Sequence, residues 1–198
     1  MITIQQLVEG FAWGMKQADA RRPVAVNQRS GVAFQPGIGP HSESATVELV
    51  AAELRNRPDF PCRDSIATQV PYPSAPRSKC DLCFGNPVEL AVEVKMLRMI
   101  GDNGKPNDNI LMHILSPYPQ HRSAVTDCDK LLASGFLTSK AILIFCYESQ
   151  DWPIEPAIMA FEALASRKCQ PQSRFVSPFL DLVHPFHRSG AVWGWYLA

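Results

Sequence analysis

The stretch KCDLCFGNPVELAVEVKML, residues 79–97, decides the fold because it has the pattern of a buried hairpin and carries charges in an apolar background. The tripeptide GNP at 85–87 predicts a turn between extended segments at roughly 78–84 and 88–97. Side chains alternate between the two faces of a strand. One face of the second segment is therefore continuously apolar and is expected to lie against the core: Leu90, Val92, Val94 and Met96.

The opposite face carries Glu93 and Lys95, about 6–7 Å apart along the strand. With a three-residue turn, Asp81 of the first segment lies opposite Ala91 and is the diagonal neighbour of Glu93, within roughly 7–8 Å at the backbone. A shift of the register by one residue would turn Asp81 to the other face. In the expected register the three charges converge on one site.

Two carboxylates at this separation can ligate one hard cation. Mg²⁺ prefers oxygen ligands and keeps several waters, so Asp81, Glu93 and the backbone carbonyl of Val94 form a sufficient ligand set. A bound Mg²⁺ polarises a phosphate oxygen and lowers the pKa of a water. Lys95 would stabilise charge on the pentavalent phosphate or orient that water. The pattern therefore predicts metal-assisted phosphodiester hydrolysis.

The segments around the hairpin predict a mixed sheet. The run KAILIFCYE, 140–148, is almost continuously apolar, as in a strand covered on both faces. A helix predicted at 121–134 leads into it, so a parallel crossover joins it to the hairpin. Further elements are predicted as helices at 4–20, from about 41 to Pro58 and at 153–168, an extended segment at 64–72 and two C-terminal strands around HRSG.

These elements give an α/β fold, with a mixed central sheet flanked by helices. The length of 198 residues suits one domain, 1–198. We expect its core at about 41–148, with the N-terminal helix and the C-terminal strands as additions.

The pattern Asp81-x11-Glu93-x-Lys95, on a hairpin after a helix that carries glutamates, resembles the PD-(D/E)xK nuclease superfamily, the fold of many restriction endonucleases. The resemblance implies that Asp81 and Glu93 bind Mg²⁺ or Mn²⁺ and that Lys95 is the catalytic lysine. It also implies that a glutamate of the preceding helix joins the site, with Glu48 the best positional match and Glu43 second. The residue before Asp81 is Cys80, where the family motif has proline.

The resemblance further implies a restriction-endonuclease-like core and a DNA endonuclease, with a role in restriction, another form of defence, or repair. A homodimer would allow both strands to be cut. Helix N-termini bind phosphate, so Gln120, Arg122 and Ser123 at the start of the third predicted helix are candidate DNA contacts. Three basic residues are candidate contacts to the DNA backbone: Arg77, Lys79 and Lys105.

Composition narrows the functional class. Hydrophobic residues make up 46% and charged residues 19%, which is ordinary for a globular protein and excludes a disordered chain. The formal net charge of zero argues against sequence-blind coating of nucleic acid. No apolar run approaches the roughly 20 residues that cross a bilayer, and the N-terminus lacks the pattern of a signal peptide. We therefore expect a cytoplasmic protein that does not enter a membrane.

Other functions stay open. The chain could be a catalytically silent module of the same fold that binds nucleic acid or forms a complex, or an interaction protein whose hairpin charges form a solvated ion pair. CDLC, Cys80–Cys83, has the spacing of zinc ligands but lacks a second such pair. HPFH offers His184 and His187 as ligands or acid–base groups. No Gly-x-Ser-x-Gly motif, phosphate-binding glycine loop or dinucleotide fingerprint occurs.

Overall fold

The computed structural model describes residues 2–148 and 151–198. A six-stranded mixed sheet has the order β1-β2-β3-β4-β6-β5. Its strands are β1 (Ile66–Tyr72), β2 (Ala75–Phe84), β3 (Leu90–Arg98), β4 (Ser139–Tyr147), β5 (Pro171–Phe179) and β6 (Gly190–Leu197). The helices are α1 (Ile4–Ala20), α2 (Glu43–Asn56), α3 (Met112–Leu115), α4 (Ala124–Leu132) and α5 (Glu155–Ala165). Short 3-10 turns occur at Arg63–Ser65 and Pro119–His121.

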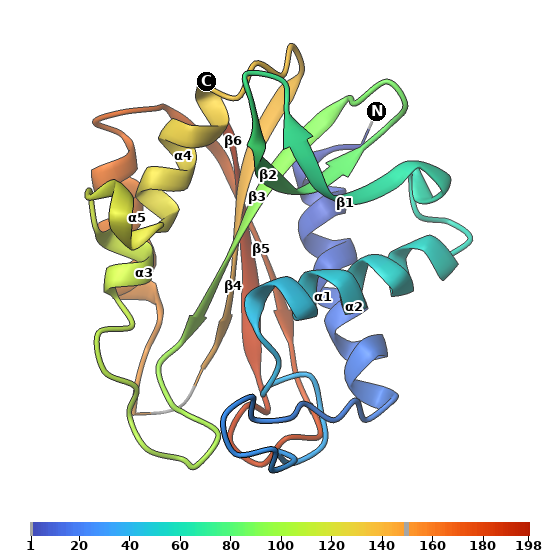
Figure 1. Cartoon of the computed structure of the whole chain (residues 1–198), viewed down its shortest axis with the longest axis vertical. Coiled ribbons are helices and arrows are strands. Elements are labelled where there is room, and N and C mark those ends of the chain that lie inside the picture. The colour runs from blue at the N-terminus through green and yellow to red at the C-terminus, as the bar shows by residue number, and fades with distance from the viewer. Residues whose placement is uncertain (1, 149–150) are drawn as a thin grey trace.

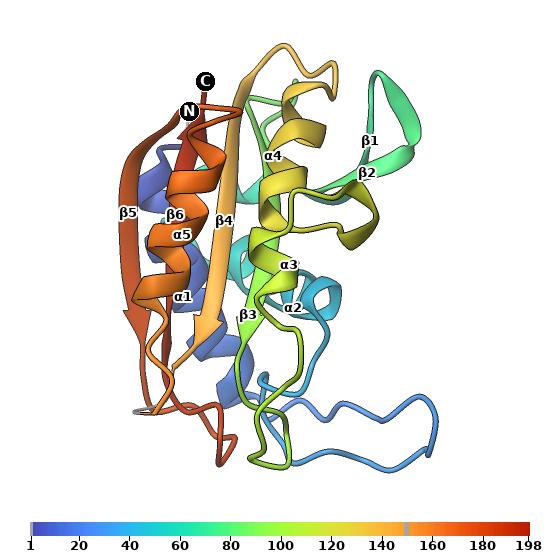
Figure 2. The same cartoon turned by 90° about the vertical axis from the view of Figure 1, so that its left-hand side faces the viewer.

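This arrangement confirms the α/β class. Strand β3 pairs in parallel with β4 along its whole length, and the other neighbouring strands pair antiparallel. Helices α1 and α2 cover one face of the sheet and α3, α4 and α5 cover the other (Figures 1 and 2). Strands β5 and β6 extend the same sheet, and α1 packs on it, so the terminal segments belong to the body of the fold.

A hydrophobic core fills each side of the sheet. The apolar face of β3 packs toward α1 and α2, as its alternation predicts. The other face of β3 is also covered, because Ala91 and Leu97 pack into the core under α4 and α5. Glu93 and Lys95 lie on this second face and are only 1% and 8% exposed. Their charges are therefore buried between the sheet and α4, and do not form a solvated surface pair.

The hairpin register differs from the expected one by two residues. Phe84 pairs with Leu90, so the turn spans residues 85–89 and Cys83, in place of Asp81, lies opposite Ala91. The Glu89 amide donates to the Phe84 carbonyl at 2.8 Å and closes this loop, in which Gly85 has φ +92°. Because the difference is an even number of residues, Asp81 keeps its expected face.

The two strands of this hairpin separate soon after the turn. Only three pairs join β2 to β3, the last being Leu82 with Val92. Beyond that point β2 continues alone with β1, through pairs such as Val70 with Cys80. The edge of β3 from Glu93 onward is therefore left open on the β2 side, although β4 covers its other side throughout. No described helix is both long and apolar enough to span a membrane.

Candidate active site

A cavity of about 580 Å³ lies where β2 leaves β3. Nine charged side chains line it, and six of them are buried or half-buried and come from four elements: Glu43 of α2, Asp81 of β2, Glu93 and Lys95 of β3, and Asp127 and Lys130 of α4. All three charged residues of the predicted Asp-x11-Glu-x-Lys pattern thus face one cavity. They meet there because β2 separates from β3 after the Leu82–Val92 pair and because α4 packs against β3.

Two carboxylates bind backbone amides on the open edge of β3. Oδ2 of Asp81 accepts from the Val94 amide at 2.9 Å, and Oε2 of Glu43 accepts from the Met96 amide at 2.7 Å. The amide and carbonyl of one strand residue point to the same side. The Val94 carbonyl therefore also points toward the space that β2 leaves. Gln69 holds the other oxygen of Asp81, Oδ1, at 3.2 Å.

Lys95 is held between two acids. Its Nζ lies 2.8 Å from Oδ2 of Asp127 and 3.3 Å from Oε1 of Glu43. Burial by itself lowers the pKa of a lysine, but these two carboxylates outweigh it and raise the pKa of Lys95 above its usual value. The ammonium group is consequently a fixed positive charge in the cavity at neutral pH.

Glu93 is the most deeply buried acid of the site. Its Oε2 lies 2.9 Å from Nζ of Lys130, and its Oε1 accepts a hydrogen bond from the hydroxyl of Tyr72. Burial first, and then the nearby charge of Asp127, raise the pKa of Glu93 to about 8, although Lys130 acts in the opposite direction. Burial likewise raises the pKa values of Asp81 and Glu43. In this structure the nearby positive charges therefore do not fully offset the cost of ionising these three buried acids.

The donor set fits a hard divalent cation. Among the buried and half-buried groups, four carboxylates face two ammonium groups, which leaves two negative charges unmatched there when all are ionised, whereas the exposed Arg77, Lys79 and Arg122 bring the whole lining to a net charge of plus one. Burial, the main cause of the raised pKa values of Glu43, Asp81 and Glu93, disfavours their charged forms, and a bound cation would offset that cost. Asp81 and Glu93, with waters and the Val94 carbonyl, supply the oxygen ligands that Mg²⁺ needs. In this structure, however, Glu93 is engaged by Lys130, so it would have to exchange that partner for the ion.

The structure does not place Glu48, the expected helix glutamate, beside Asp81 and Glu93. Glu48 is exposed on α2 and does not line the cavity, whereas Glu43, the second choice, does. The reason is geometric. Val47 and Val50 turn the middle of α2 into the core, so only the N-terminal end of the helix reaches the open edge of β3.

The predicted DNA contacts divide into two groups. Arg77, Lys79 and Arg122 are exposed and line the cavity, around its acidic floor. Lys105 and Gln120 are exposed but do not line it.

Ser123 requires a correction, because its side chain is fully buried. Its hydroxyl accepts from the Thr126 amide at 3.2 Å as the N-cap of α4 and donates to the Ser116 carbonyl. The residue therefore has a structural role at the start of α4 and is not accessible to DNA.

Sequence reasoning missed Asp127, Lys130 and Tyr72. Asp127 and Lys130 are three residues apart on one helix and pair at 3.2 Å, a spacing that is visible in the sequence. They read there as an ordinary solvated pair, since nothing local shows that this side of α4 covers β3. Tyr72 ends β1, and no sequence signal connects it to Glu93.

The other predicted ligands lie elsewhere. All six cysteines are free, and Cys80 and Cys83 are buried packing thiols, which gives no support to a zinc site at CDLC. Within residues 2–148 and 151–198, one group of three ligand side chains has its donor atoms within 4.8 Å of one another, and it consists of Asp102, His184 and His187. This group lies outside the cavity described above.

Comparisons of the chain with protein-family models, with curated proteins and with solved structures find no match.

Proposed function

We propose that the chain is a divalent-metal-dependent endonuclease that hydrolyses phosphodiester bonds of DNA. The observation that carries this proposal is the convergence of Asp81, Glu93 and Lys95 on one cavity, where carboxylates outnumber ammonium groups among the buried and half-buried side chains. The acidic inner part of the cavity suits an anionic substrate only if a cation lies between the carboxylates and that substrate. Exposed arginine and lysine side chains at the rim support a polyanionic substrate.

The roles of the residues follow from their contacts. Asp81 and Glu93 would hold Mg²⁺ or Mn²⁺, with the Val94 carbonyl as a third ligand. When bound, the ion supplies charge stabilisation at a phosphate oxygen and lowers the pKa of a water. Lys95 acts through its charge on the phosphate, because its raised pKa keeps Nζ protonated and unfit to remove a proton. Glu43 and Asp127 are positioning residues that hold Nζ in place.

The proposed oligomeric state, biological role, location and core type all depend on the proposed nuclease activity. One of the three pockets described within residues 2–148 and 151–198 has this lining, so cutting both strands of a duplex there requires a homodimer or two separate events. A role in defence or repair and a location in the cytoplasm belong to the same proposal, as does a restriction-endonuclease-like core of the PD-(D/E)xK type.

A nuclease assay on supercoiled and linear DNA tests the activity, with Mg²⁺, Mn²⁺ or EDTA. We expect metal-dependent cutting by the wild type and a loss of at least about 100-fold in Lys95→Met, which keeps most of the stem but removes the charge. Lys16→Ala, at an exposed lysine on α1, is the matched control and should cut normally. Circular dichroism and thermal unfolding of each variant establish that loss of cutting is not loss of folding.

A second candidate is a silent nucleic-acid-binding module, and one observation favours it. Lys130 pairs with Glu93, one of the two carboxylates that the metal ion would need. If this ion pair persists in the presence of Mg²⁺, Asp81 is the one proposed carboxylate ligand left to the ion. Two results together would favour this module over the enzyme. The protein would bind DNA but would not cut it in the presence of any of the metals tested, and Asp81→Asn would not change Mg²⁺ binding in calorimetry.

A further inference from the structure

A second cluster of ligand side chains lies at the end of the sheet where β3 stops. Asp102 follows β3, and His184 and His187 belong to the segment between β5 and β6. Loops far apart in the sequence meet here, at the lower end of the molecule in both views (Figures 1 and 2). None of the three residues lines the candidate active site.

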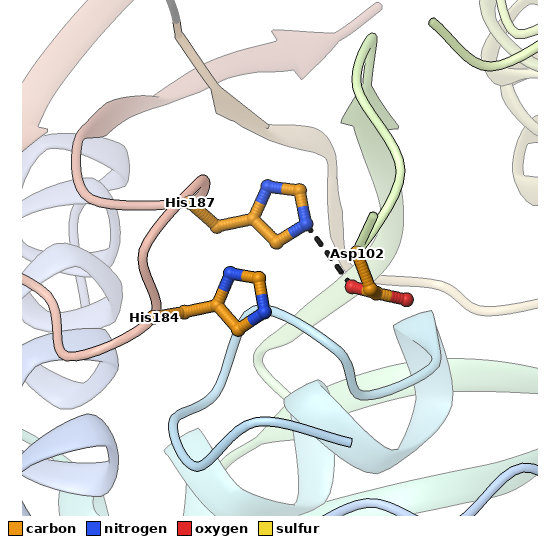
Figure 3. A group of neighbouring side chains, drawn as sticks. All are labelled: Asp102, His184 and His187. Carbon is orange, nitrogen blue, oxygen red and sulfur yellow. Dashed lines mark hydrogen bonds and ion pairs between the residues drawn. The ribbon is translucent and has the colours of Figure 1, made fainter. Parts of the chain in front are cut away.

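The ligand atoms of the three side chains lie close together. They are within 4.8 Å of one another, and Nε2 of His187 lies 3.1 Å from Oδ1 of Asp102. The two imidazole rings stack at 4.6 Å with 12° between their planes. Figure 3 shows both rings with a nitrogen directed toward the Asp102 carboxylate. A tetrahedral ion spaces its ligands about 3.3 Å apart, so the ligand atom of His184 would move by about 1.5 Å, and its ring would turn out of the stack because an imidazole lone pair lies in the ring plane.

His184 supplies the observation that points to a ligand. Its side chain is 0% exposed, and Nε2 has no hydrogen-bond partner. A buried polar atom without a partner is costly, yet this nitrogen faces a carboxylate and a second imidazole. A neutral imidazole is the form that binds metals.

Neighbouring residues give room and support to the pair of rings. A Cβ at Gly39 would lie 2.7 Å from the Cβ of His187, and one at Gly37 would lie 3.1 Å from the His184 amide. Only glycine permits these close approaches without displacing the histidines. Arg98 donates to Oδ1 of Asp102 at 3.3 Å, as partners of metal-ligating carboxylates do.

We propose that Asp102, His184 and His187 form a transition-metal site, for Zn²⁺ or a metal of similar ligand preference, that ties the loop after β3 to the β5–β6 segment. Two nitrogen donors and one oxygen donor suit Zn²⁺ and not Mg²⁺. The side chain of Asp102 is 17% exposed, so an ion can reach the site from solvent past this carboxylate. Nδ1 of His184 now accepts from the Phe186 amide at 3.3 Å. Binding through Nε2 moves the ring proton to Nδ1 and removes this one contact.

Cobalt spectroscopy tests the site. Apo protein titrated with Co²⁺ should show visible absorption bands that saturate at one ion per chain, and Zn²⁺ should displace them. His184→Gln and His187→Gln should each weaken binding by at least about 100-fold, since even the loss of a supporting partner costs 10–100-fold. His41→Gln is the matched control, because His41 also has a buried Nε2 without a partner but is not in the group.

Two further measurements make the result decisive. Asp81→Asn should keep the Co²⁺ bands, which separates this site from metal binding in the candidate active site. In ¹⁵N-histidine spectra of the wild type, Zn²⁺ should shift two of the five histidines, which requires no variant to fold. Unchanged Co²⁺ binding in both histidine variants, or no binding by the folded wild type, would mean that the cluster is a packing arrangement only.

Discussion

Lys95 of β3 and Asp127 of α4 form a buried ion pair, with 2.8 Å between Nζ and Oδ2. This pair fastens α4 to the strand that carries the predicted metal ligand Glu93, and the charge of Asp127 also acts on that ligand. The helix is therefore part of the electrostatics of the site, and its contribution can be separated from that of the strand.

Replacing Asp127 with asparagine should lower the pKa of Glu93 from about 8 toward its ordinary value, because Asp127 is the largest charge effect that raises it. The change keeps the shape of the side chain but leaves Lys95 with one carboxylate fewer. We expect unfolding to become easier by about 1–3 kcal/mol, as for a buried polar group that loses part of its partnership. Carboxyl ¹³C NMR titration measures the pKa, and Asp129→Asn, an exposed acid two residues away, is the control.

Stability should fall as the pH rises from about 4.5 to about 8. The folded-state pKa of Glu93 is about 8 against an ordinary 4.5, so in this window the folded protein holds a proton that the unfolded chain has released. The free energy of unfolding then decreases with pH, by up to about 1.4 kcal/mol per pH unit for one group. Asp81 and Glu43 shift in the same direction. Chemical unfolding at several pH values measures the slope.

Two comparisons support the assignment of that slope to the site. Glu93→Gln should flatten it, because glutamine does not titrate. Mg²⁺ should stabilise the wild type more at pH 8 than at pH 6, since the ion binds the ionised carboxylates. An equal effect of Mg²⁺ at both pH values, or the same slope in Glu93→Gln, would contradict a metal site built on Glu93.

Glu43→Gln should lower nuclease activity by about 10–100-fold, the range for residues that support a metal or a charged group. Glutamine can still accept from the Met96 amide, but it no longer neutralises Lys95. Glu48→Gln, on the same helix but exposed, should cut at the wild-type rate. The ratio of kcat/KM for the two variants is the measurement, and equal rates would exclude Glu43 from the site.

The contrast between Glu43 and Glu48 shows what the sequence could predict. The faces of β3 follow from alternation, which is local, so the shared side of Glu93 and Lys95 was predictable. Even the error in the turn length left Asp81 on that side, because the register moved by two residues. Which glutamate reaches the strand depends on how α2 packs across the sheet. Sequence periodicity shows that Val47 and Val50 are buried, but it does not show where each end of the helix lies.

The same limit hid the contribution of α4. The sequence predicts a helix at 121–134, but it does not show which side of that helix is buried, or whether Asp127 is. The side that carries Asp127 is buried only because the crossover from β3 to β4 lays α4 over Glu93 and Lys95. Ser123 was misread for a related reason, since the N-cap of a helix is a phosphate site only when it is open to solvent, and here it is buried.

The rim of the cavity should contact DNA phosphates. Arg77→Ala and Arg122→Ala should each weaken the binding of a DNA duplex and reduce the slope of log Kd against log salt by about 1, because each loses one released counterion. Binding is measured by fluorescence anisotropy with Ca²⁺ in place of Mg²⁺, so that the duplex stays intact. Lys105→Ala removes an equally exposed charge that does not line the cavity, and it should leave both quantities unchanged. If the lysine variant lost as much affinity as the arginine variants, overall charge would account for DNA binding, and the cavity would not be the DNA-binding site.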